Sequence, residues 1–82
     1  MNEATALFDV NEIDEKLVEE VLNEVSFILK ERGYNPINQI VGYIISGDPG
    51  YISSFKDARS KMLTLDRTML VEVLLKNYIG KI

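Results

Sequence analysis

The middle of the chain contains two helix stop signals, and each is followed almost at once by a helix start signal. Gly33 is a residue type that commonly ends a helix, and Asn35-Pro36 follows it, with Asn as a cap and Pro at the first helical position. Gly47 and Asp48-Pro49 repeat the same order. Elements bounded this closely must be short. The sequence therefore predicts helices joined by tight turns.

Apolar residues recur at helical spacing on both sides of the first stop signal. The segment before Gly33 carries such a set over about six turns. Acidic residues at its start and basic residues at its end suit the helix dipole, and Asn11 is the predicted N-cap. Its apolar positions are Leu17, Val18, Val21, Leu22, Val25, Ile28 and Leu29. A second set, predicted to form a core face, is Ile37, Ile40, Val41, Ile44 and Ile45.

The remainder of the chain predicts two further helical regions. A third apolar face consists of Tyr51, Ile52, Phe55, Ala58 and Met62. Serine favours caps over helix interiors, so a break near Ser53-Ser54 stays open at this point. Asp66 is the predicted cap of the last helix, and Leu65 before it is placed to pack on Leu70. This last helix is apolar on more than one side, so we expect its second side to pack against another subunit.

Length and composition limit the ways in which this chain gains stability. A chain of 82 residues fits one domain, and a domain of this size buries too little surface for high stability from its core alone. It contains neither Cys nor His, which leaves oligomerisation as the available reinforcement. We expect an all-α bundle of four to five helices that forms a homodimer. Residues 1–10 show no period and are predicted as a flexible arm before a single helical domain, residues 11–82.

The same absences argue against catalysis and cofactors. Without Cys and His, the common nucleophile–base pairs and most transition-metal sites have no building blocks. The acidic residues are expected along a solvated helix face, so no metal site is predicted. The turn at Gly47-Asp48-Pro49-Gly50 lacks the Lys-Ser/Thr of a phosphate-binding loop. The acidic start has no signal-peptide run and no segment is long enough to span a bilayer, so we expect a cytoplasmic, non-enzymatic protein without membrane insertion.

Two features point to regulation through protein binding. Thr5 is the only Ser or Thr outside the predicted folded body, and kinases require an accessible, extended target. Lys56, Arg59 and Lys61 form a basic set on the third helical region, suited to an acidic partner or to a phosphorylated arm. A helix-turn-helix DNA-binding regulator is the alternative. The net charge of −4 argues against it, because nucleic-acid affinity depends on neutralising phosphates.

The run of residues 33–52, from Gly33-Tyr34-Asn35-Pro36 to Ser46-Gly47-Asp48-Pro49-Gly50-Tyr51-Ile52, resembles the signature block of the IreB family of small regulatory phosphoproteins from Gram-positive bacteria. Residues 56–59 resemble it too, and the likeness covers nearly the whole chain. It implies an all-helical homodimer whose N-terminal arm is phosphorylated by a membrane-anchored serine/threonine kinase that senses cell-wall state. It also implies negative regulation of peptidoglycan synthesis, a role in cephalosporin tolerance and, in at least one branch, control of Clp-dependent proteolysis.

The resemblance also bears on individual residues. Thr5-Ala6-Leu7-Phe8 is similar to the family's Thr-x-x-Phe arm, which makes Thr5 the expected phosphoacceptor. Asn2 stands where some members have a second arm threonine, and Ser54 where members commonly have a basic residue. Arg59 is the matching member of the basic set. Together these features predict a kinase-controlled adaptor, with adaptor or protease-complex proteins as its partners.

Overall fold

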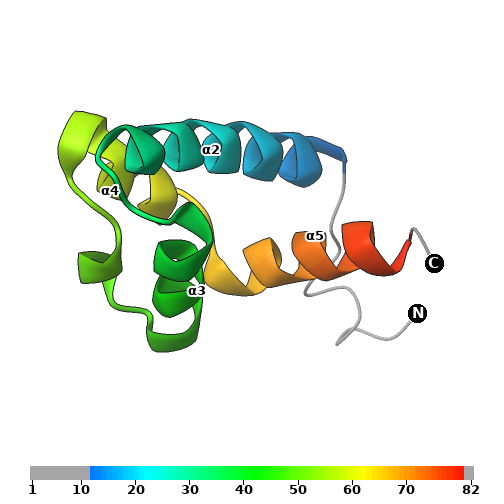
Figure 1. Cartoon of the computed structure of the whole chain (residues 1–82). Coiled ribbons are helices and arrows are strands. Elements are labelled where there is room, and N and C mark those ends of the chain that lie inside the picture. Colours follow the sequence, from blue (N-terminus) through cyan, green and yellow to red (C-terminus); the bar gives the residue numbers. More distant parts are fainter. Residues whose placement is uncertain (1–11, 81–82) are drawn as a thin grey trace.

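The computed structural model describes residues 12–80, and every regular element among them is helical. The elements in chain order are α2 (Glu12–Glu31), α3 (Pro36–Ser46), the 3-10 turns η1 (Pro49–Tyr51) and η2 (Phe55–Asp57), α4 (Ala58–Leu63) and α5 (Arg67–Ile79). The long helix α2 lies across the other helices and packs against α3, α4 and α5 (Figure 1). The predicted all-α fold is confirmed.

Helix α2 supplies the largest part of the core. Its buried side chains are Val18, Val21, Val25, Ile28 and Leu29, all members of the predicted apolar face. Lys30 lies in the last turn, as the helix dipole favours, and Gly33 follows with a left-handed φ of 84°. The predicted cap Asn11 lies outside the described residues.

Both predicted boundaries of α3 are confirmed. The side-chain oxygen of Asn35 accepts a hydrogen bond from the Asn38 backbone N–H at 3.2 Å, and Pro36 begins the helix. Gly47 ends it in the left-handed region, with φ of 75°, and its N–H donates to the Tyr43 carbonyl at 2.7 Å. The Arg67 guanidinium occupies the space that a side chain at position 47 would need. Glycine is therefore favoured there by its conformation, and a side chain would also force the Arg67 guanidinium to shift.

The predicted core face of α3 is only partly correct. Tyr43 is the buried residue of this helix, at 4% exposure, and Ile40 and Ile44 are partly buried beside it. Ile37, Val41 and Ile45 were expected in the core but are exposed. The apolar stripe of α3 is wider than the surface that the other described helices cover. Tyr43 packs in the core, and Ile37, Val41 and Ile45 remain at the surface.

The third helical region is broken twice. Residues 53 and 54 are not helical, so the serine pair does interrupt it, and the Ser53 hydroxyl accepts a hydrogen bond from the Phe55 N–H at 3.1 Å. The second break was not predicted. Lys56 and Asp57 both adopt left-handed conformations, with φ of 51° and 63°, before α4 begins. Such conformations are costly for residues other than glycine.

Helix α5 begins as predicted. The Asp66 carboxylate accepts a hydrogen bond from the Met69 N–H at 2.9 Å, and Leu65 and Leu70 are both buried in the core. Among residues 12–80, one side of the helix is buried, through Leu70 and Val73. Its exposed apolar side chains are Leu74, Leu75, Tyr78 and Ile79.

Candidate protein-binding surface

Two of the three predicted basic residues lie together over α2. The Lys56 Nζ lies 3.1 Å from an oxygen of Glu31, and the Lys61 Nζ lies 3.9 Å from an oxygen of Glu24. The Lys61 Nζ also lies 3.5 Å from the Lys56 carbonyl oxygen. Both lysines line a surface hollow of about 490 Å³ that also includes Phe27, which is 65% exposed. We call this the Phe27 hollow. It is a place where charged groups surround an exposed aromatic ring.

An additional cation, which the sequence did not single out for this surface, lies next to the Phe27 hollow. The Arg32 guanidinium lies 4.6 Å from the centroid of the Phe55 ring, and the Lys56 Nζ lies 5.4 Å from it. These distances allow cation–π attraction. The sequence indicated only that Arg32 lies near the end of a helix. Its contact with the Phe55 ring, 23 positions further along, has no local signal.

Arg59 does not line the Phe27 hollow. Its Nε donates a hydrogen bond to the Ile52 carbonyl at 2.9 Å, and its backbone N–H donates to the Ser53 carbonyl at 3.0 Å. Arg59 therefore ties the loop after η1 to the first turn of α4. The structure places Lys56 and Lys61 at the same hollow, whereas the Arg59 side chain binds the Ile52 carbonyl of its own chain. Partner binding by all three residues stays a prediction.

Exposed apolar side chains gather on α3 and α5. On α3 they are Ile37, Val41 and Ile45, with exposures of 73%, 46% and 80%. On α5 they are Leu74, Leu75, Tyr78 and Ile79. Between the two helices, Ile44 of α3 and Val71 of α5 line one hollow. Single exposed apolar residues are ordinary, but a set of this extent marks an interaction surface.

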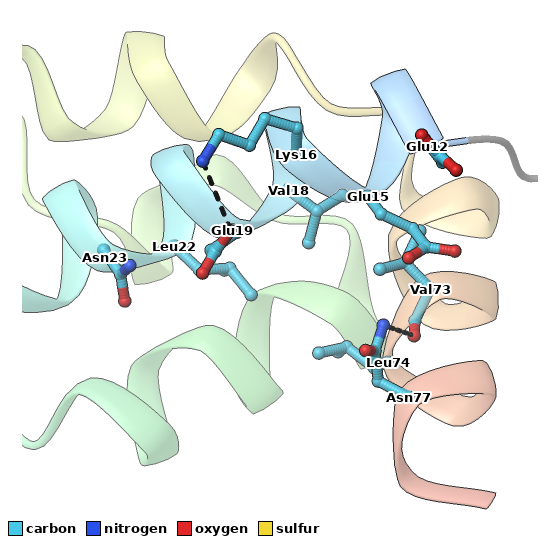
Figure 2. A pocket seen from close by; sticks show the side chains of 10 residues that line it. All are labelled: Glu12, Glu15, Lys16, Val18, Glu19, Leu22, Asn23, Val73, Leu74 and Asn77. Carbon is cyan, nitrogen blue, oxygen red and sulfur yellow. Dashed lines mark hydrogen bonds and ion pairs between the residues drawn. The ribbon is translucent and has the colours of Figure 1, made fainter. Parts of the chain in front are cut away.

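A further hollow of about 500 Å³ lies between α2 and α5 (Figure 2). Val18 and Leu22 from α2 and Val73 and Leu74 from α5 form its apolar part, and glutamates of α2 surround it. The ion pair of Lys76 with Glu15, at 2.6 Å, connects the two helices. This hollow therefore extends the apolar surface of α5 towards the start of α2.

Two other kinds of feature are absent from residues 12–80. No three Asp or Glu residues in this range lie close enough to hold a metal ion together. No helix in the same range is long and apolar enough to cross a bilayer. The predicted phosphoacceptor Thr5 lies outside the described residues.

Fold and surface together define a small all-helical protein with exposed apolar faces and a hollow in which ion-paired lysines surround an exposed aromatic ring. The family model of the IreB regulatory phosphoprotein matches residues 3–80, which is nearly the whole chain. The chain therefore belongs to the IreB family, a family of regulatory phosphoproteins. The match includes the segment that carries Thr5 and the whole of the described helical body.

Proposed function

We propose that this chain is a non-enzymatic regulator that a membrane serine/threonine kinase phosphorylates at Thr5 and that acts by binding other proteins. The observation that carries the proposal is the family match, because it names a regulatory phosphoprotein and its range, residues 3–80, includes Thr5. The regulated process is peptidoglycan synthesis, with negative control and an effect on cephalosporin tolerance. The proposed partners are cytoplasmic adaptor or protease-complex proteins, including the Clp system.

The hydroxyl groups of the helical body support Thr5 as the target. The Ser46 hydroxyl donates to the Gly42 carbonyl at 2.7 Å, and the Thr64 hydroxyl donates to the Lys61 carbonyl at 2.6 Å. Ser46 is the last residue of α3 and Thr64 directly follows α4, so both hydroxyls lie at helix ends and bond to the backbone, unlike the extended segment that a kinase binds. Ser54 is the strongest competitor, because it is exposed and lies between two 3-10 turns.

The effect of the modification is electrostatic. A phosphate on Thr5 adds about −1.5 to −2 charge at pH 7 to an N-terminal segment that already contains Glu3 and Asp9. A change of this size alters the affinity of the segment for any charged partner surface. The proposed switch therefore acts on partner binding, with Lys56, Arg59 and Lys61 as the basic side of the contact.

A homodimer is part of the proposal. The exposed apolar sets on α3 and α5 provide a surface for a second copy, since the described residues bury one apolar side of α5 and leave Leu74, Leu75, Tyr78 and Ile79 exposed. Small domains without disulfides commonly gain stability by this route. No feature of the described residues favours the DNA-binding alternative. Lys56 and Lys61 are ion-paired with glutamates, and Arg59 binds a backbone carbonyl.

The test of the phosphoacceptor is incubation of the chain with the cognate kinase and ATP, followed by intact-mass measurement. We expect the parent chain and the control variant Ser54→Ala to gain one phosphate and Thr5→Ala to gain none. Equal phosphate uptake by Thr5→Ala and the parent would overturn the assignment. A pull-down with Thr5→Ala and Thr5→Glu then tests the switch, and identical partner profiles for the two variants would contradict it.

A further inference from the structure

We propose that the Phe27 hollow binds the chain's own N-terminal arm (residues 1–10) when Thr5 carries phosphate. This inference rests on the proposed phosphorylation and names the surface that receives it. The hollow is lined by Phe27, Lys56 and Lys61, together with the two glutamates that pair with the lysines. The occupant is the segment around Thr5, which contains acidic residues and the apolar pair Leu7-Phe8.

The charges of the hollow suit a phosphate better than the unmodified arm. Each lysine is held by one carboxylate, Lys56 by Glu31 and Lys61 by Glu24, and every member of these pairs is at least one-third exposed. Exposed pairs of this kind contribute little to stability, so they can be exchanged. A phosphate carries about −1.5 to −2 charge and three acceptor oxygens, so it is a stronger partner for an ammonium group than a single carboxylate is. The unmodified arm offers only carboxylates, which carry no more charge than the glutamates that already pair with the lysines.

The backbone at the hollow is strained in a way that presents these lysines. Lys56 and Asp57 are the only described residues other than glycine with positive φ. Their left-handed turn brings the Lys56 carbonyl within 3.5 Å of the Lys61 Nζ and leaves the Lys56 side chain over α2. Strained backbone that surrounding contacts maintain is found preferentially at functional sites.

The length of the arm fits this occupant. Thr5 is seven residues before Glu12, and an extended chain of that length spans about 23–25 Å. Helix α2 rises about 1.5 Å per residue, so Glu24 lies about 18 Å along the helix from Glu12. The Lys61 side chain, which pairs with Glu24, is therefore within reach of Thr5 of the same chain. Along this path the arm passes Ile13 and Leu17, exposed apolar residues that line a shallow groove on α2.

The experiment uses the full chain, phosphorylated at Thr5 by the kinase and verified by intact mass. Backbone amide spectra are compared before and after phosphorylation for the parent, for Lys56→Gln/Lys61→Gln and for the control Lys76→Gln, which removes the same kind of charge from α5. We expect phosphorylation to shift the amides of Phe27, Lys56 and Lys61 in the parent and in the control, and not in the double variant. Removal of Thr5 phosphate by a phosphatase should be about tenfold faster in the double variant, which corresponds to two exposed ion pairs.

Three results would overturn the docking. One is a parent spectrum in which phosphorylation shifts only residues 1–11. Another is equal dephosphorylation of the double variant and the Lys76→Gln control. The last is an equal shift at the hollow when inorganic phosphate is added to the unphosphorylated chain, which indicates general anion binding. If the kinase does not modify Thr5 at all, the proposed function fails at the mass measurement, before the docking is examined.

Discussion

Replacing Leu75 by serine tests whether the exposed side of α5 is the dimer surface. Leu75 is 53% exposed in the single chain. Full burial of a leucine side chain is worth about 1.5–3 kcal/mol, so a second copy that covers the exposed half gains about 0.8–1.6 kcal/mol per protomer. A twofold dimer contains this contact twice. We therefore expect dimer formation to weaken by about 1.6–3.2 kcal/mol, or about 15–200-fold in the dissociation constant.

The assay is sedimentation equilibrium over a range of protein concentrations, with circular dichroism to verify that helix content is retained. Leu63→Ser is the matched control, because Leu63 is 50% exposed but lies at the end of α4, outside the proposed surface. It should leave the dissociation constant unchanged. The reasoning is refuted if Leu75→Ser dimerises as tightly as the parent, or if Leu63→Ser weakens the dimer equally. A parent chain that is monomeric at micromolar concentration refutes the dimer itself.

Three further predictions concern stability, measured by urea denaturation at one fixed protein concentration. Met62→Ala removes a fully buried side chain and should cost about 2–5 kcal/mol; a loss under 1 kcal/mol would mean that the site is not the packed core described here. Asp66→Ala removes the cap that accepts from the Met69 N–H and should cost about 0.5–2 kcal/mol, whereas no change would contradict a stabilising cap. Gly42→Ala places a methyl group against the Tyr51 ring and should cost about 1–3 kcal/mol, and Tyr51→Ala in the same chain should recover part of that loss if the clash is its cause.

Local signals in the sequence were sufficient to place most helix boundaries. The caps at Asn35 and Asp66 each bond to a backbone N–H three residues further along, so the residues that decide the boundary lie within one turn. The signal that ends α3 is also local, because the left-handed conformation of Gly47 depends on the absence of a side chain at that residue. The buried face of α2 followed from its 3.6-residue period, since a long helix in a small domain has one side available for the core.

The contact surfaces were less accessible to sequence analysis, because they depend on residues far apart in the chain. Lys56 was recognised as basic, but its pairing with Glu31 joins positions 25 residues apart. Arg59 belonged to the same basic set, yet its guanidinium binds the Ile52 carbonyl because the loop after η1 folds back on α4. The Phe27 hollow, the residues that surround it and the strained turn at Lys56 left no pattern in the sequence.

The sequence by itself determined that the chain is helical and where α3 and α5 begin. Each of these follows from residue type or from neighbours within one turn. Only the tertiary structure decided which part of the α3 stripe is buried. Tyr43 and the inner isoleucines pack within the fold while Ile37 and Ile45 remain outside, since the partner helices cover only part of the stripe. The physical reason is that the hydrophobic pattern of a helix shows which of its side chains are apolar. Which of those side chains become buried depends on how the other helices pack against it.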